Sequence, residues 1–561
     1  MISEKFPIGW TKGPSDQPND FTFVSPDHDR FLKIGEFVTY EAKMDGKERQ
    51  ILSRIIDRQP LLQFPDSFLA DPQIAPDQVA QLIGYDQKDH EQFVLTATII
   101  GYFDEQLDGF INPRIPPREG NPIYIAFDEL LTHLLSKKRI TQQGSAHIGS
   151  LLSREIDKVP VVLDVASLVS THLAIIASTG AGKSYLAGVL VEELMSQYNR
   201  AAVLVIDPHG EYDTLAEMMN IEHFRTSDYR PEIKIFRAGQ VKVKVAALEP
   251  GDFYYLLPNL SDRMIYLLGK AYREVSKDSR MNKGEPDRWT RAELELKLDD
   301  LGTSEEEDTG KGKADFASTA QALSWRLDSV LKNSLIFDDQ KHLNLNELCR
   351  PGQCSVLQLN EVDEREQQVM VATLLRRLLK ARIETQKNRV DEGDELYLPY
   401  PVFVLIEEAH RFAPASADIV TTGVLKTILS EGRKFGVGVG LISQRPGKLD
   451  GDVLSQCNTQ FIMRIVNPVD QGRVAESIET VGRDLIRELP ALTKGQVIIA
   501  GEAINTPVLA RVRTRYTRHG GETKDAPAEW LKYLSPIEQE KRDREAALPV
   551  SGGKKRDRKF K

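Results

Sequence analysis

The sequence is poor in cysteine, in long apolar runs and in net positive charge, and each shortage excludes a class of protein. Three cysteines among 561 residues are too few for a disulfide framework, and no Cys-x-x-Cys pair indicates a metal site. No apolar run reaches the about 18 residues of a membrane span, and the N-terminus lacks a basic-then-apolar signal pattern. We therefore expect a cytoplasmic protein without a membrane anchor.

The charge balance excludes a uniformly basic nucleic-acid-binding surface. The formal net charge is −10, in an otherwise ordinary globular composition with 41% hydrophobic and 28% charged residues. A locally basic channel inside an acidic oligomer stays compatible with this charge. The length itself predicts about three or four domains.

The first 150 residues are predicted to form a small β-barrel or sandwich. Strand-like segments at 35–40, 49–56 and 93–102 are short and separated by turn signals. A helix over 127–135 is expected to close this domain, which we place at 1–150.

Strands and helices alternate over 151–249 and again over 342–517, and this pattern predicts the two parts of one doubly wound α/β core. The expected core strands lie at 173–176, 202–206, 355–359, 402–406, 437–442, 461–465 and 496–500. Ligands of such a core bind at the carboxyl ends of its strands.

Two further regions flank or interrupt this core. Residues 250–341 have helical spacing of apolar residues at 260–275 and 317–331, which predicts a helical insert. We expect the polar run at 304–313 to be a mobile loop. Residues 518–561 are predicted to form a C-terminal extension with a short helix near Trp530. For its basic end at 554–561, a solvated tail and an interaction arm both stay open.

The most informative stretch spans residues 173–184, where an apolar run feeds a small-residue loop ending in Gly182-Lys183-Ser184. A strand, a glycine-bearing loop and a helix form the context of a P-loop, whose backbone N–H groups cradle phosphates. Lys183 is expected to reach the β- and γ-phosphates and Ser184 to ligate Mg²⁺. Ala177 stands where the pattern has its first glycine, and because alanine resists positive φ, the entry of the loop is in question.

A second element is the apolar strand at 402–406, which runs into Glu407 and Glu408. This is the Walker B arrangement, in which the first carboxylate orients Mg²⁺ or its water and the second acts as a base on the attacking water. The alternative is a solvated charge pair at a strand end. His410 follows, either as a sensor of the bound state or as a structural hydrogen-bonding group.

Four more residues add to this constellation. Arg433, in Glu431-Gly432-Arg433-Lys434, is a candidate arginine finger, although an Arg-Lys pair usually lies on the surface. Gln444 follows the strand at 437–442 and is placed to contact a γ-phosphate. Asp207 and Glu211 follow the second core strand and are expected near the same edge of the sheet.

Together these residues resemble one family, the HerA hexameric DNA translocases, which are related to FtsK within the RecA-like P-loop ATPases. The resemblance covers nearly the whole chain and rests on five motifs in the family's order. They are Ser-Thr-Gly-Ala-Gly-Lys-Ser at 178–184, Ile-Asp-Pro-His-Gly-Glu-Tyr at 206–212, Glu-Glu-Ala-His-Arg-Phe-Ala-Pro at 407–414, Glu-Gly-Arg-Lys-Phe-Gly at 431–436 and Ser-Gln-Arg-Pro at 443–446.

The resemblance implies a RecA-like ATPase core with an N-terminal small β-barrel and an inserted helical subdomain, assembled as a homo-hexamer with ATP and Mg²⁺ at the subunit interfaces. Glu407, Glu408 and Gln444 would act in the subunit that binds the nucleotide, with Ser184 and Glu407 at the metal. Arg433, and as a second contributor Arg464, would come from the neighbouring subunit. The nucleotide would contact Thr179, Gly180, Ala181, Gly182, Lys183, Ser184 and Tyr185.

The same resemblance implies a partner and a role. Double-stranded DNA would thread the central pore, and the barrels would carry a NurA-type nuclease, or a sirtuin-like or other nuclease effector, in DNA end processing or anti-phage defence. A second hypothesis is a nucleotide-gated scaffold ring that regulates an effector with little translocation of its own. A conjugation or secretion pump of the same superfamily ranks last, because it would normally bring a membrane anchor.

Overall fold

The computed structural model of the chain describes residues 6–26, 32–44, 46–61, 92–107, 109–283, 287–309, 313–477, 482–520, 525–533 and 536–547. Contacts divide the chain into two compact units, Met1–Arg518 and His519–Lys561. The second unit contains helices α17 (Ala526–Tyr533) and α18 (Pro536–Ala547), so the helix expected near Trp530 is confirmed. The basic end at 554–561 lies outside the described residues.

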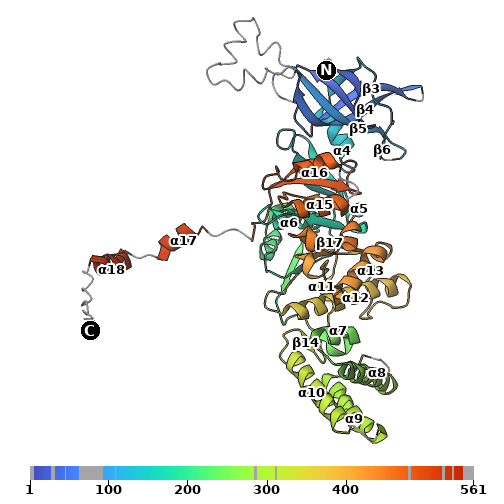
Figure 1. Ribbon diagram of the computed structural model, residues 1–561, viewed down its shortest axis with the longest axis vertical. Helices are drawn as coiled ribbons and strands as arrows, with labels where there is room; N and C mark the ends of the chain where they lie inside the picture. Colours follow the sequence, from blue (N-terminus) through green and yellow to red (C-terminus); the bar gives the residue numbers. More distant parts are fainter. Residues whose placement is uncertain are drawn as a thin grey trace, which may run out of the picture. The chain divides into compact units, whose positions relative to one another are not determined.

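The first unit begins with a closed, six-stranded antiparallel barrel, which confirms the expected β-rich N-terminal region (Figure 1). Its strand order is β2-β1-β7-β3-β4-β5, and the pairing of β5 with β2 closes it. Alternate side chains of β5 are buried in the barrel core, as expected for strands with one buried face. The strands are β1 (Gly9–Pro14), β2 (Asp20–Ser25), β3 (Phe37–Met44), β4 (Lys47–Pro60), β5 (Phe93–Asp104), β7 (Pro122–Ile125) and the appended β6 (Gly109–Ile111).

An eleven-stranded sheet forms the centre of the unit, in the order β12-β15-β11-β16-β17-β10-β18-β19-β20-β8-β9. The strands from β12 to β18 pair in parallel, and β19, β20, β8 and β9 continue the sheet antiparallel. Their bounds are β8 (Ser145–Leu151), β9 (Pro160–Asp164), β10 (Leu173–Ile176), β11 (Val203–Asp207), β12 (Glu232–Phe236), β15 (Gln353–Gln358), β16 (Val402–Ile406), β17 (Val437–Ser443), β18 (Thr459–Ile462), β19 (Gln496–Gly501) and β20 (Val508–Val512).

Helices cover both faces of this sheet, which confirms the doubly wound α/β core. Successive residues of the buried strands enter opposite hydrophobic clusters: Leu173 and Ile175 enter one, Ala174 and Ile176 the other. Helix α6 (Lys183–Leu194) packs into the first cluster, and α12 (Glu364–Gln386) and α13 (Val420–Phe435) pack into the second. Shorter helices are α4 (Asp128–Leu135), α5 (Val165–Ser170), α11 (Leu345–Leu348), α14 (Gly451–Ser455), α15 (Pro468–Ser477) and α16 (Arg483–Glu488).

The insert between the two parts of the core is helical, as predicted, and consists of α7 (Pro250–Leu256), α8 (Asp262–Lys283), α9 (Arg291–Thr309) and α10 (Lys313–Leu331) (Figure 1). The expected mobile loop at 304–313 is wrong for most of its length, because α9 continues to Thr309 and α10 begins at Lys313. Glutamate is a good helix former, so a charged run can extend a helix as well as end it. Residues 310–312 lie outside the described residues.

The barrel packs directly on the core. Arg54 of β4 forms an ion pair with Asp484 at 2.6 Å and donates to the Pro507 carbonyl at 3.0 Å. The expected boundary at 150 falls inside β8, which pairs with β20 in the central sheet, whereas the barrel strands end at Ile125. Among the described residues, no helix is long and apolar enough to cross a membrane.

Candidate functional site

The loop between β10 and α6 has the backbone geometry of a P-loop. Gly180 and Gly182 have φ of 80° and 107°, in the left-handed region that favours glycine. Ala177 is not among the described residues with positive φ, and its buried N–H donates to the Ser443 carbonyl at 3.2 Å. Alanine therefore fits where the pattern has its first glycine, and the doubt about the loop's entry is resolved.

Lys183, at the start of α6, is buried against the two carboxylates that end β16. Its ammonium forms a short hydrogen bond to Glu407 and lies 3.4 Å from Glu408 Oε1. Burial raises the pKa of Glu407 to about 7, although Lys183 opposes this shift. Burial acts to lower the pKa of Lys183, but the charges of Glu407 and Glu408 outweigh it and the pKa is raised. A phosphate at the loop would compete with these carboxylates for the ammonium.

Glu408 is the most constrained residue of the site. It has φ 52° and ψ 44°, and a non-glycine residue in this left-handed region stores strain that clusters at functional sites. Gln444 donates from Nε2 to Glu408 Oε1 and accepts from Thr179 Oγ1 at 2.8 Å. His410 Nδ1 lies 3.2 Å from Glu408 Oε2, and burial lowers the pKa of this histidine. One amide thus joins the P-loop to the predicted base.

The segment after β11 brings further oxygen atoms to the same edge of the sheet. Asp207 is buried and accepts backbone N–H bonds from His209, Gly210 and Tyr212 at 3.2, 2.8 and 3.2 Å. Burial raises the pKa of Asp207, and these N–H donors act against the shift. The folded turn aims Glu211 at the start of α6.

The side-chain oxygen atoms at the C-terminal ends of these strands are of the kind that ligate Mg²⁺ beside a nucleotide. Ser184 Oγ donates to Glu211 Oε2 at 2.7 Å, and Tyr212 OH donates to Glu407 Oε2 at 3.0 Å. Mg²⁺ prefers oxygen ligands and usually keeps waters and substrate phosphates beside one or two carboxylates. Ser184 is in direct contact with the carboxylate of Glu211, whereas the carboxylate of Glu407 is bound by Lys183 and Tyr212.

The side chains of the two predicted arginines, Arg433 and Arg464, form no contact with the carboxylates around Lys183 among the described residues. Arg433 is exposed in the last turn of α13, which leads into the start of β17. Because the P-loop follows the C-terminal end of β10, which runs parallel to β17, Arg433 lies at the opposite end of the strands. The structure does not bring it to the nucleotide site of its own chain. Arg464 follows β18, and its carbonyl accepts the Ser178 N–H at 3.0 Å, so its backbone supports the P-loop of the same chain. Its side chain is exposed.

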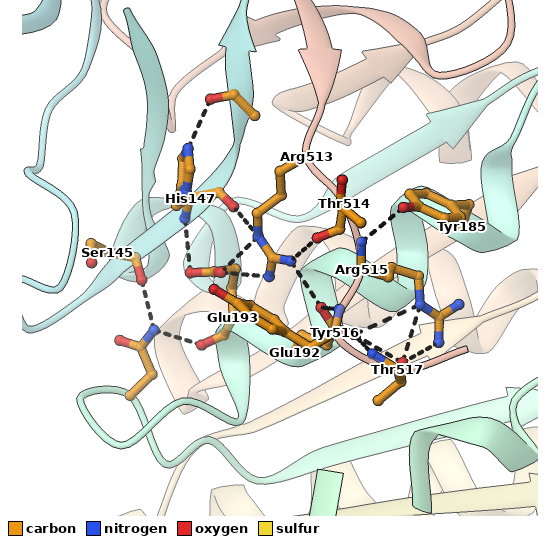
Figure 2. Close-up of polar contacts among 12 residues, drawn as sticks. Ser145, His147, Tyr185, Glu192, Glu193, Arg513, Thr514, Arg515, Tyr516 and Thr517 are labelled. Atoms are coloured by element: carbon orange, nitrogen blue, oxygen red, sulfur yellow. Dashed lines mark hydrogen bonds and ion pairs between the residues drawn. The ribbon is translucent and has the colours of Figure 1, made fainter. Parts of the chain in front are cut away.

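The opposite flank of α6 is held by residues 513–517, which follow β20 and which we term the strap (Figure 2). Arg513 pairs with Glu192 at 2.9 Å and with Glu193 at 2.6 Å, and all three side chains are at most 7% exposed. The Thr517 backbone N–H and Oγ1 both donate to Glu192 Oε1 at 2.8 Å. The charged groups are therefore paired and hydrogen-bonded, as buried charges must be.

The strap also reaches the beginning of α6, next to the P-loop. The Arg515 N–H donates to the Tyr185 hydroxyl at 2.8 Å (Figure 2). The Arg515 guanidinium passes over Gly188, where an added Cβ would lie 2.3 Å from Arg515 Cζ. Glycine in a helix interior costs stability, and here it leaves the space that the arginine fills. Tyr185, expected at the nucleotide, is thus fixed by the strap.

The sequence motifs predict Lys183, Ser184, Glu407, Glu408 and Gln444 at one site. The structure joins Lys183, Glu407, Glu408 and Gln444 by direct contacts, and Ser184 contacts Glu211 beside them. The strap residues and their partners on α6 were missed. Tyr212 belongs to the 206–212 motif, but its contact with Glu407 was not anticipated. The only sequence signal for the strap is the pair of acidic residues at 192 and 193 on an otherwise apolar helix.

Comparison with known proteins gives a consistent result. A family model described as "Helicase HerA, central domain" matches residues 146–378. The chain is 31% identical over 458 residues to the DNA double-strand break repair helicase HerA of Pyrococcus furiosus, covering 76% of this chain and 78% of that protein. It is 30% identical over 436 residues to HerA of Saccharolobus solfataricus, covering 75% and 78%. Among solved structures, VirB4 of Thermoanaerobacter pseudethanolicus matches at 14% identity and a TM-score of 0.48, covering 67% and 98%.

Proposed function

Because the chain belongs to the HerA helicase family and is a P-loop ATPase, we propose that it is a homo-hexameric translocase or helicase that moves double-stranded DNA at the expense of ATP. The observation that carries this proposal is the cluster of Lys183, Glu407, Glu408 and Gln444 at one edge of the sheet. A purely structural protein has no need of a strained, buried carboxylate beside a buried lysine.

In the proposed reaction, the P-loop N–H groups and the start of α6 hold the phosphates, and Lys183 moves from Glu407 and Glu408 to the β- and γ-phosphates. Glu408 accepts a proton from the attacking water. Mg²⁺, held by Ser184 and Glu407, neutralises charge on the phosphates when it is bound. Gln444 contacts both Glu408 and Thr179, so it can respond to the loss of the γ-phosphate.

Arg433 supports the assembly as a ring. It is exposed at the edge opposite its own P-loop, where it is available to the nucleotide site of a neighbouring copy. An arginine supplied in trans stabilises charge on the transferring phosphoryl group and makes hydrolysis depend on the subunit interface. Arg464, whose backbone supports the P-loop of its own chain, is the second candidate for such a contact.

The partner is proposed to be a nuclease carried on the barrels, either of the NurA type or a sirtuin-like or other nuclease effector. The relatives named as double-strand break repair helicases favour DNA end processing, and anti-phage defence is the alternative setting. The competing function is a nucleotide-gated scaffold ring. The net charge of −10 favours this alternative, because a motor that grips DNA phosphates needs local positive charge.

Steady-state ATP hydrolysis by the purified protein, with and without linear duplex DNA, tests the proposal. Stimulation by DNA that disappears in Glu408→Ala is expected of a motor. Turnover that ignores DNA, or that begins only when a nuclease partner is added, would contradict the motor and favour the scaffold.

A further inference from the structure

A recess of 590 Å³ lies where α4 and the end of β5 meet the edge of the central sheet, away from the nucleotide site. Its volume is within the about 300–1,000 Å³ of pockets that bury a small ligand or one unit of a larger one. Phe103, the loop at 136–142, Lys158 and Asn505 contribute to its wall, so both the barrel and the core line it. We term it the junction pocket.

The junction pocket is cationic in a chain of net negative charge. Lys137, Lys138, Arg139 and Lys158 line it, whereas its carboxylates are Asp128 and Glu129. The first three are consecutive, and the sequence has no other run of three basic residues before 554.

The carboxylates near the junction pocket neutralise only part of this charge. Asp128 lies 3.5 Å from Arg154, which faces away toward Glu36 at 2.9 Å, and Lys138 lies 3.9 Å from Asp164. Within the described residues, neither Lys137 nor Arg139 forms an ion pair. Two cations that line the pocket are therefore available to an anionic ligand.

Aromatic rings stand beside these cations. Phe103 is half-buried, with its ring centroid 6.4 Å from that of the exposed His133, and Phe110 packs edge-on against Phe103 at 5.6 Å. Proteins bind single-stranded nucleic acid with basic side chains along its phosphate backbone and with aromatic rings on which its bases stack. A duplex presents only its outer phosphates to a recess of this size, because its bases are paired inside.

We infer that the junction pocket binds a segment of single-stranded DNA, with Lys137 and Arg139 at its phosphates and Phe103 and His133 against a base. The inference rests on the proposed action on DNA and adds a site for an unpaired strand or end, at the joint between barrel and core. A single DNA strand bound in the junction pocket would contact both the barrel and the central sheet. An acidic segment of a protein is the competing occupant of the same charges.

The test is the affinity of the full-length protein for a fluorescent oligothymidine, measured over a series of salt concentrations without nucleotide. In Lys137→Ala/Arg139→Ala, we expect affinity to fall about tenfold or more and the slope of log K against log salt to decrease by about 1.4, because each single-strand phosphate contact contributes about 0.7. Phe103→Leu should weaken binding about fivefold with an unchanged slope, because it removes stacking and no charge.

A matched control is Lys341→Ala/Arg350→Ala, which removes one exposed lysine and one exposed arginine elsewhere and changes the net charge equally. Its slope should stay that of the unmodified protein. Basal ATP hydrolysis should be unchanged in all of these variants, since none lies at the P-loop.

Each outcome is decisive. Equal losses in the junction and control variants would overturn the inference, because the effect would then be one of net charge. Loss of polyglutamate binding with intact oligothymidine binding would overturn it in favour of an acidic protein segment. An unmodified protein that binds neither oligothymidine nor duplex DNA would contradict the proposed function itself. Intact duplex binding with an unaffected junction variant would remove only the pocket.

Discussion

The two sides of helix α6 show how differently one element can be supported. At its N-terminal end, Lys183 pairs with Glu407 and Glu408, and Ser184 donates to Glu211, contacts that a nucleotide bound in the proposed site would replace. Along its flank, Glu192 and Glu193 are sealed under Arg513 with their hydrogen bonds filled (Figure 2). In the proposed function, the first side exchanges partners with the nucleotide, whereas the contacts of the second side are complete without one.

The difference is visible in strain and in pairing. Glu408 is held in a strained left-handed conformation and is bound by Gln444. Arg513 donates hydrogen bonds to both of its carboxylate partners, Glu192 and Glu193. Substitutions on the two sides should therefore separate loss of chemistry from loss of stability.

The largest expected effect follows from Lys183→Ala. The ammonium is the cation that faces both Glu407 and Glu408, and it is the group expected at the phosphates. We expect loss of nucleotide binding and a decrease of kcat/KM by about 100- to 1,000-fold or more. Calorimetric titration with Mg·ATP and a turnover assay check this. Near-normal turnover would contradict the site.

Glu408→Ala should separate binding from hydrolysis. It removes the proposed base and leaves Lys183 and the P-loop in place, so ATP should still bind while kcat falls about 100- to 1,000-fold. Filter binding of labelled ATP, followed by analysis of the bound nucleotide, should recover ATP and little ADP. Rapid turnover by this variant would remove the assignment of the base.

Arg513→Ala should act on the other side of the comparison. It leaves Glu193 buried without its cation, and Glu192 with Arg515 Nε at 3.8 Å as its remaining cation, which costs about 3–5 kcal/mol of the free energy of unfolding. Urea denaturation measures the loss, and KM for ATP in the remaining folded protein should change little.

Arg518→Ala is the matched control for this prediction. Arg518 pairs with Glu217 at 2.7 Å, but its side chain is 83% exposed, and surface pairs are worth less than about 1 kcal/mol. Equal destabilisation by the two substitutions would mean that the strap is no more than a surface contact.

A smaller effect on stability is expected from substitution of Gly188, and its sign should depend on whether Arg515 is present. Gly188→Ala places a Cβ against the Arg515 guanidinium and should destabilise the protein by about 1–3 kcal/mol. In an Arg515→Ala background the guanidinium that the new Cβ would meet is gone, and the same change should stabilise by about 1 kcal/mol, because alanine favours helix over glycine. A double-mutant cycle followed by thermal unfolding measures both signs. Additive effects would contradict the close approach.

A graded effect on activity is expected from pH. Because burial raises the pKa of Glu407 to about 7, the free protein takes up a proton there as pH falls through that value. A neutral Glu407 is a poorer partner for Lys183 and for Mg²⁺, so kcat/KM should fall about tenfold per pH unit below about 7. Glu407→Gln should show a flatter profile at lower activity. A flat profile in the unmodified protein would contradict this role.

The residues at the N-terminal end of α6 and their partners could be predicted from the sequence, whereas the contacts of the strap along its flank could not. Lys183, Glu408 and Gln444 each follow an apolar strand within a short contiguous motif, and the parallel sheet then brings those strand ends together. Nothing local marks Arg513 as a partner of Glu192, 321 positions away. Charged residues on a helix are usually solvated, and only the packing of the folded chain shows that these are buried.

The insert gives the complementary lesson. The polar run at 304–313 was expected to be a loop from its composition, yet α9 continues through it to Thr309. Glutamate is charged and also a good helix former, so a run of glutamates does not by itself indicate a loop. The packing of α9 against α10 favours a longer helix, and this tertiary contact cannot be read from composition.

Movement of the protein along duplex DNA is the measurement that tests the central claim most directly. A third strand bound to one end of a linear duplex should be displaced in an ATP-dependent manner, at a rate that falls with the length of duplex to be crossed. Glu408→Ala should bind ATP and displace nothing. ATP hydrolysis by the unmodified protein without any displacement would contradict the motor and leave the nucleotide-gated scaffold as the function of this site.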